Sequence, residues 1–130
     1  MSDYSIKILG NVVWLVFGGI VIAMEYFIFS LVLMITVVGI PFSFQTLKLA
    51  SFALFPFGRT SVVKSKEPGC LYTGMNIFWI LLGGIWIALT HLAFGIILGI
   101  TIIGIPFGIQ HFKLASLALS PFGRVVVPSE

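Results

Sequence analysis

The side chains that could catalyse a reaction are few and widely separated in this sequence. Its four acids are Asp3, Glu25, Glu67 and Glu130, and no two of them stand at a short spacing. General acid–base catalysis needs such groups within reach of one substrate. We therefore expect that the protein is not an enzyme.

The sequence also lacks a group of residues that could bind a metal ion or carry out redox chemistry. His91 and His111 are 20 residues apart and are predicted to lie on opposite sides of a membrane, which removes the obvious metal site. Cys70 is the single cysteine, so no internal disulfide can form. The Gly-Gly pairs lie inside apolar runs rather than after a strand, which argues against a phosphate loop. We predict no metal, no other cofactor and no nucleic-acid partner.

The composition is that of a membrane protein. Of 130 residues, 59% are hydrophobic and 8% are charged, and the mean hydropathy is +1.19. The 43 residues from Cys70 to Phe112 contain no Asp, Glu, Lys or Arg, and an apolar run of that length is buried in lipid. Residues 1–10 lack a signal-peptide pattern, so we expect the N-terminus to be retained.

The chain contains the same unit twice. With an offset of 65 residues, Asn11–Arg59 aligns with Asn76–Arg124 without a gap, and 26 of the 49 aligned positions are identical. Such self-similarity indicates a tandem repeat. We assign residues 1–60 to the first repeat, 61–73 to a polar linker and 74–130 to the second repeat.

Length and charge predict how one repeat enters the membrane. A helix that crosses about 30 Å of hydrocarbon needs about 20 residues, so each apolar run predicts a transmembrane helical hairpin. Its turn is predicted at Glu25-Tyr26 and Thr90-His91, with Gly18-Gly19 as a competing break. All cations then fall on one side, which favours parallel repeats with both termini cytoplasmic over inverted repeats. These cations are Lys7, Lys48, Arg59, Lys64, Lys66, Lys113 and Arg124.

Pro41 and Pro106 are helix breaks that predict the start of a further short helix after each hairpin. The segments 42–55 and 107–120 are too short to cross, and we predict that they lie in the cytoplasmic interface. The motif "PFGR" should end each helix, with its arginine beside the last carbonyls. The β-rich segments "RTSVV" and "RVVVP" that follow are predicted to pair as a ribbon.

The repeated Gln-x-x-Lys pattern is the main candidate for binding. Lysines of an interfacial helix usually extend to the lipid headgroups. In a homo-oligomer they would alternatively line a vestibule that favours anions. The candidate pore-lining or headgroup-binding residues are Gln45, Lys48, Gln110, Lys113, Arg59 and Arg124.

Other repeated positions predict local structure. Asn11 and Asn76 are interpreted as helix caps or as polar contacts between spans, and Trp14 and Trp79 as members of the interfacial aromatic belt. Thr36 and Thr101 are expected to hydrogen-bond to carbonyls freed by the proline breaks, with coordination of a permeant ion as the alternative. Glu25 is predicted at a solvated tip, or inside a span if the Gly-Gly break is real. Close helix packing, and hence a homo-oligomer, is predicted from Gly95, Gly99, Gly104 and Gly108.

The pattern N-x-x-W-x-x-x-G-G, I-T-x-x-G-I-P-F, Q-x-x-K-L-A and P-F-G-R, present in both halves, resembles the YccF family of small bacterial inner-membrane proteins. The resemblance covers Asn11–Arg124, and the second copy fits better. It implies a multi-pass protein of the bacterial inner membrane built from two such domains, and it brings no activity or catalytic residue. Ser30, Met34 and Ser43 depart from the glycines of the second copy.

The sequence thus predicts an all-α membrane protein of two parallel repeats, each a transmembrane hairpin followed by a Pro-initiated interfacial helix. Two functions are open. One is a homo-oligomeric channel or transport component, with a membrane transport partner. The other is a non-conducting scaffold or accessory subunit whose basic face binds anionic lipid of the bilayer or a partner protein.

Overall fold

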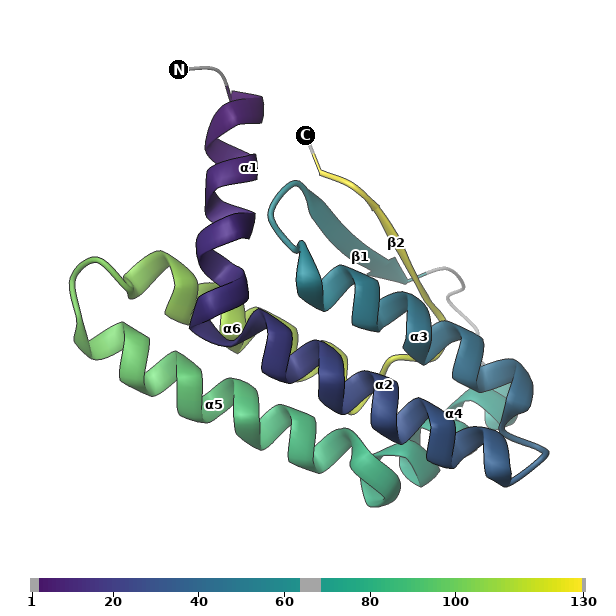
Figure 1. Cartoon of the computed structure of the whole chain (residues 1–130). Helices are drawn as coiled ribbons and strands as arrows, with labels where there is room; N and C mark the ends of the chain where they lie inside the picture. The colour runs from purple at the N-terminus through teal and green to yellow at the C-terminus, as the bar shows by residue number, and fades with distance from the viewer. Residues whose placement is uncertain (1–2, 64–68, 130) are drawn as a thin grey trace.

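The computed structural model describes residues 3–63 and 69–129, which are mainly helical (Figure 1). Both halves have the same order of elements, as the duplication predicts. The linker predicted at 61–73 overlaps a strand and a helix, and its residues 64–68 lie outside the described residues. The elements are α1 (Asp3–Trp14), η1 (Leu15–Gly19), α2 (Ile20–Ile35), α3 (Ile40–Leu54), β1 (Arg59–Val63), α4 (Gly69–Trp79), η2 (Ile80–Gly84), α5 (Ile85–Ile100), α6 (Ile105–Leu119) and β2 (Arg124–Pro128).

The first long helix bends at the Gly-Gly pair and not at the position predicted for a turn. Gly18 has φ 123°, a conformation that a residue without Cβ adopts readily, and Figure 1 shows α1 at a steep angle to α2. Glu25-Tyr26 lie inside α2, and Thr90-His91 lie inside α5. The predicted turn is wrong because neither site has a Gly or Pro to interrupt the helix, and an interruption would leave backbone groups unpaired in apolar surroundings.

The chain reverses at residues 36–39 and 101–104 instead. Thr36 Oγ1 donates a hydrogen bond to Leu33 O over 2.6 Å and accepts one from the Gly39 N–H over 3.0 Å. Thr101 makes the same two bonds, to Leu98 O over 2.8 Å and from the Gly104 N–H over 2.9 Å. The predicted bonding of these threonines to preceding carbonyls is confirmed, although each carbonyl also accepts the backbone N–H of the same threonine. These bonds close each turn.

The helices that follow begin where the prolines predict. Pro41 and Pro106 occupy the first turns of α3 and α6, where a missing N–H leaves no hydrogen bond unmade. Each helix returns along the one before it, α3 on α2 and α6 on α5 (Figure 1). The helical hairpin of each repeat is therefore formed by the helices on either side of the proline, and not by two spans ahead of it.

The Asn-x-x-Trp motif fastens each hairpin to the helix that precedes it. Asn76 donates to Phe122 O over 3.3 Å and accepts from the Phe122 N–H over 2.9 Å. One turn later, Trp79 Nε1 donates to Ala118 O at the end of α6 over 2.9 Å. Asn11 and Trp14 repeat these bonds with residues 57 and 53. The interpretations as helix cap and aromatic belt are wrong, because the asparagines lie within helices and both tryptophans are fully buried.

We expect Asn76→Ala to lower the free energy of unfolding by about 1–3 kcal/mol, because both backbone groups of Phe122 lose their partner beside a buried indole. Circular dichroism during SDS titration of the purified protein would measure the change. Thr73→Ala is the matched control on α4, since among the described residues its exposed hydroxyl bonds to Gly69 O of the same helix, and a loss within about 0.5 kcal/mol is expected there. Equal losses in both variants would contradict the role of Asn76.

The Gly-Gly pairs make room for aromatic rings. A Cβ on Gly19 would overlap the indole of Trp14, and a Cβ on Gly84 would overlap that of Trp79. The first glycine of each pair instead receives a ring from the other repeat, because Phe94 lies against Gly18 and Phe29 lies against Gly83. These reciprocal contacts interlock the two repeats.

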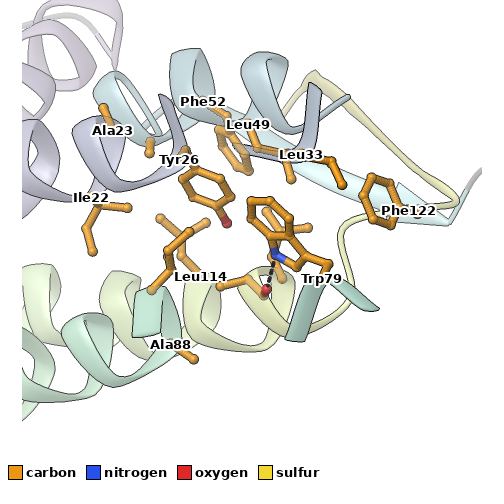
Figure 2. Packing of buried hydrophobic residues seen from close by; sticks show 14 of the residues in the cluster. Ile22, Ala23, Tyr26, Leu33, Leu49, Phe52, Trp79, Ala88, Leu114 and Phe122 are labelled. Carbon is orange, nitrogen blue, oxygen red and sulfur yellow. Dashed lines mark hydrogen bonds between the residues drawn. The ribbon is translucent and has the colours of Figure 1, made fainter. Parts of the chain in front are cut away.

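The two strands pair as the sequence predicts. β1 and β2 form an antiparallel ribbon in which Arg59 is opposite Pro128 and Ser61 is opposite Val126. Below the ribbon, a core of buried aromatic and aliphatic side chains lies between the hairpins. Figure 2 shows Tyr26 of α2 beside Trp79 and Leu114 of the second repeat. One core therefore holds both repeats together.

Two helical stretches are long and apolar enough to cross a membrane. They are Tyr4–Ile35 and Gly69–Ile100, of 32 residues each, with mean hydropathies of 2.2 and 2.1. Many of their large apolar side chains are exposed, such as Val16, Met24 and Trp86. A surface of this kind is stable against lipid rather than water.

Candidate functional site

The predicted binding residues gather in two grooves beside the ribbon. The first, called the α6 groove, has a volume of about 360 Å³. The second, called the α3 groove, has a volume of about 350 Å³. Residues of the α6 groove include Gln110, Lys113, Ser116, Arg59, Thr60, Ser61 and Arg124, and those of the α3 groove include Gln45, Lys48, Ser51, Arg59 and Val125–Pro128.

Each groove combines one helix with the strand of the other repeat. Gln110, Lys113 and Ser116 are on one face of α6 at helical spacing, and they lie opposite β1. In the α3 groove, α3 lies opposite β2. Gln45 holds α3 of the first repeat against the strand of the second, because its Nε2 donates to Pro121 O over 3.1 Å and to Arg124 O over 2.8 Å. The two lysines are exposed, so their ammonium groups remain available to a ligand.

The two arginines hold the helix ends that border the grooves. Arg59 donates from Nη2 to Ser51 O over 2.7 Å and from Nε to Phe55 O over 3.1 Å, and Arg124 Nε donates to Ser120 O over 3.1 Å. The predicted placement of arginine beside the last carbonyls is confirmed. Partial burial lowers the pKa of Arg59, but an arginine keeps its charge at neutral pH.

The sharp turns ahead of the arginines require glycine. Gly58 has φ 94° and Gly123 has φ 91°, in the left-handed region that side chains with a Cβ rarely adopt. These turns direct the chain from α3 and α6 into the ribbon. The motif P-F-G-R thus ends the helix and places its arginine in the lining of a groove.

The grooves have the chemistry of an anion site. Their described lining residues include cations, amides and hydroxyls but no Asp or Glu. Lysine binds an oxyanion as a point charge, and arginine and the Gln110 amide add directed hydrogen bonds, whereas the Gln45 amide already donates to two backbone carbonyls. Within the described residues no three His, Cys, Asp or Glu side chains are grouped to hold a metal ion.

The two histidines lie together, contrary to the prediction that they are on opposite sides of the membrane. His91 Nδ1 and His111 Nδ1 are 2.9 Å apart, and His111 Nε2 is 2.9 Å from Phe17 O at the bend. The carbonyl can only accept, so His111 carries its proton on Nε2 and a neutral His91 donates from Nδ1. His91 Nε2 is then buried and has no partner in the described part of the chain.

The prediction failed because it rested on the wrong turn. Once α5 continues past Thr90-His91 and reverses at residues 101–104, α6 returns beside it and brings His111 to His91. In the first repeat the position of His111 is occupied by Thr46, which hydrogen-bonds to Ser30 across α2 and α3. Each hairpin therefore contains one buried polar pair between its two helices, which sequence spacing did not reveal.

Glu25 lies inside α2 and not at a solvated tip. Thr90 Oγ1 donates to Glu25 Oε2 over 2.8 Å, and Glu25 Oε1 is buried without a partner among the described residues. Positions 25 and 90 are equivalent in the two repeats. Glu25 thus lies within a long apolar helix, as predicted for a real Gly-Gly break.

The glycines predicted to pack helices have unequal surroundings. A Cβ on Gly108 would lie 2.8 Å from Gly95 O, and a Cβ on Gly95 would lie 2.9 Å from the ring of Phe112. Gly104 is close to Thr101 within the turn, whereas a Cβ on Gly99 would meet no atom within 4 Å. These approaches join α5 to α6 inside one chain, so association into a homo-oligomer stays a prediction.

Comparison with known proteins agrees with the two-repeat organisation. Residues 9–59 and 74–124 each match the family described as the inner membrane component domain, YccF. Two relatives named inner membrane protein YccF, from Escherichia coli (strain K12) and Shigella flexneri, are each 35% identical over 128 residues, which cover 92% of this chain and 86% of the relative. No solved structure matches the chain. The chain therefore belongs to the YccF family of inner membrane proteins, and it carries the family's domain twice.

Proposed function

We propose that the ribbon side of this protein binds the anionic phosphate groups of membrane lipids at the cytoplasmic surface, as a non-conducting accessory component of the inner membrane. The observation that carries the proposal is the composition of the two grooves. They contain Lys48, Lys113, Arg59 and Arg124 without an acidic neighbour among the described lining residues. Their volumes of about 360 and 350 Å³ suit a headgroup.

The position of the grooves supports lipid as the source of the phosphate. Both grooves adjoin helices with exposed apolar side chains, such as Phe44 on α3, Phe55 directly after α3 and Phe112 on α6. A phosphate bound by Lys48 or Lys113 could therefore keep its acyl chains against these rings. Free phosphate would use the same cations but would gain nothing from the apolar surface.

Binding can be measured as thermal stabilisation of the purified protein in a neutral detergent. Short-chain phosphatidylglycerol is expected to raise Tm, whereas phosphatidylcholine with the same chains and inorganic phosphate should change it little. The double variant Lys48→Glu/Lys113→Glu should lose most of the stabilisation, and Lys48→Arg/Lys113→Arg should keep it because the positive charges remain. Equal stabilisation by both lipids, or an undiminished effect in the glutamate variant, would refute the proposal.

The competing proposal is a homo-oligomeric, anion-preferring channel in which the lysines line a vestibule between copies. Within one chain, the contact between the repeats is filled by the Glu25–Thr90 pair and by the shared core. An ion path would therefore have to run between copies. Planar-bilayer conductance whose anion preference is reversed by Lys48→Glu/Lys113→Glu would favour the channel, while absent conductance with retained lipid stabilisation would favour the accessory component.

A further inference from the structure

The two repeats are related by an approximate twofold axis through the ribbon. Ser61 and Val126 are 65 residues apart and therefore equivalent, and they face each other in the antiparallel register. Glu25 and Thr90 are also equivalent and are joined by a hydrogen bond. An antiparallel pair has its twofold axis perpendicular to the ribbon, so this axis passes from the centre of the ribbon to the Glu25–Thr90 contact.

The two ends of this axis differ in chemistry. All five lysines and arginines of the described residues lie near the ribbon. Four of them line the grooves, and the aliphatic part of Lys7 is close to Gly58, where an added Cβ would be 3.3 Å from Lys7 Cδ. Figure 1 shows α3 between the ribbon and α2. The other end is formed by α2 and α5, whose exposed side chains include Met24, Phe27, Trp86 and Leu89.

The tips of both hairpins are apolar and strongly exposed. Val37 and Val38 are 70% and 69% exposed, and Ile102 and Ile103 are 87% and 84% exposed. A turn that emerges into water on the far side of a membrane normally carries polar residues, and these turns expose pairs of β-branched apolar residues instead. The tips therefore have the chemistry of a surface that stays in hydrocarbon.

We propose that the protein enters the membrane from one side only, with the twofold axis along the membrane normal and both hairpins lying in the plane of one leaflet. The ribbon and grooves then remain in the aqueous headgroup region, and α2, α5 and the hairpin tips contact acyl chains. The occupant of the exposed apolar face is thus lipid hydrocarbon. This arrangement goes beyond the proposed phosphate binding and does not depend on it.

Helix lengths agree with this placement. α2 and α3 have 16 and 15 residues, or about 24 and 22 Å at 1.5 Å per residue, and both are shorter than the ~30 Å of a hydrocarbon core. α1, with 12 residues, reaches about 18 Å, roughly the depth of one leaflet. The bend at Gly18 then directs α2 along the membrane instead of across it. With the axis in the membrane plane, the cations would lie at the bilayer centre, where charge is costly.

The test uses single cysteines in a Cys70→Ser background, reconstituted in proteoliposomes. Val38→Cys and Ile103→Cys place a thiol at each tip, and Ser61→Cys places one on the ribbon. We expect an impermeant maleimide to label Ser61→Cys from one side and the tip variants from neither side, at least about ten-fold more slowly, until detergent is added. Tip labelling from the side opposite to Ser61→Cys would show that the hairpins cross the membrane, and labelling from the same side would place the tips outside the hydrocarbon.

A second measurement needs no added cysteine. Trp86 is 58% exposed on α5, whereas Trp14 and Trp79 are fully buried. Lipids brominated deep in the acyl chain are expected to quench the fluorescence of Trp86 more than lipids brominated near the headgroup, and Trp86→Phe should remove this quenching. Absent quenching of Trp86 would show that acyl chains do not contact α5 and would overturn the proposal, and stronger quenching near the headgroup would place α5 too shallow for it.

Discussion

Trp79→Ala is expected to lower the free energy of unfolding by about 3–5 kcal/mol, the range for removing a buried aromatic side chain. The Trp79 side chain is fully buried, stacks on Tyr26 with ring centroids 6.1 Å apart and donates its hydrogen bond to Ala118 O, drawn as the dashed line in Figure 2. The alanine leaves a cavity at the contact between the repeats, and it leaves the end of α6 without its donor. SDS titration followed by circular dichroism would measure the loss.

Trp86→Ala is the matched control, because it removes the same type of side chain about two turns further along the helical stretch Gly69–Ile100. Trp86 is exposed, so its removal creates no cavity inside the protein, and the expected change is within about 1 kcal/mol. A comparable loss of stability in Trp79→Ala and Trp86→Ala would show that the burial of Trp79 and its hydrogen bond to Ala118 O contribute little. Trp14→Ala should behave like Trp79→Ala, since Trp14 Nε1 donates to Ala53 O over 2.7 Å.

Gly18→Ala is expected to destabilise the protein by about 2–4 kcal/mol, because it combines backbone strain with overpacking. Gly18 has φ 123°, and an added Cβ would lie 2.8 Å from Cε1 and 2.9 Å from Nε2 of His111. The methyl group would displace His111 from Phe17 O and thereby disturb the contact between the histidines. The same titration measures stability, and NMR of histidine-labelled protein would report the displaced imidazole.

The control for this substitution is Gly99→Ala. Gly99 is in α5 without a positive φ, and a Cβ there meets nothing within 4 Å. Alanine is favoured over glycine inside a helix, so a gain of up to about 1 kcal/mol is expected. Unchanged stability and an unchanged histidine spectrum in Gly18→Ala would mean that α1 and α2 can straighten without cost, and the bend would then have no structural role.

Local signals identified much of the fold. Pro41 and Pro106 started helices, Thr36 and Thr101 bonded to preceding carbonyls, and the arginines of P-F-G-R reached the last helical carbonyls. Each of these features depends on backbone groups within eight residues of the side chain involved. The ribbon was predictable for a related reason, because the duplication guaranteed two equivalent β-rich segments.

The errors share a different cause. Asn11 and Asn76 bind backbone 46 residues away, and His111 contacts a carbonyl 94 residues away, so neither role can be derived from neighbouring residues. The one available signal was that the spacing between the asparagine and P-F-G is equal in both repeats, because each asparagine bonds to the phenylalanine of that motif. The turn was misplaced because the most polar point of an apolar run was taken as its surface, whereas Glu25 finds its partner in Thr90 of the other repeat.

The sequence by itself determined that this is a membrane protein of two equivalent units, that each unit contains a helix starting at proline and stopped by P-F-G-R, and that lysine and glutamine recur on that helix. Only the tertiary structure decided that the Gly-Gly pair bends the first helix, that the histidines meet, and that the groove cations of both units gather beside one ribbon. Hydropathy and helix-stop signals act along the chain, whereas the partner of a buried polar group or an aromatic ring is decided by which distant segments pack together.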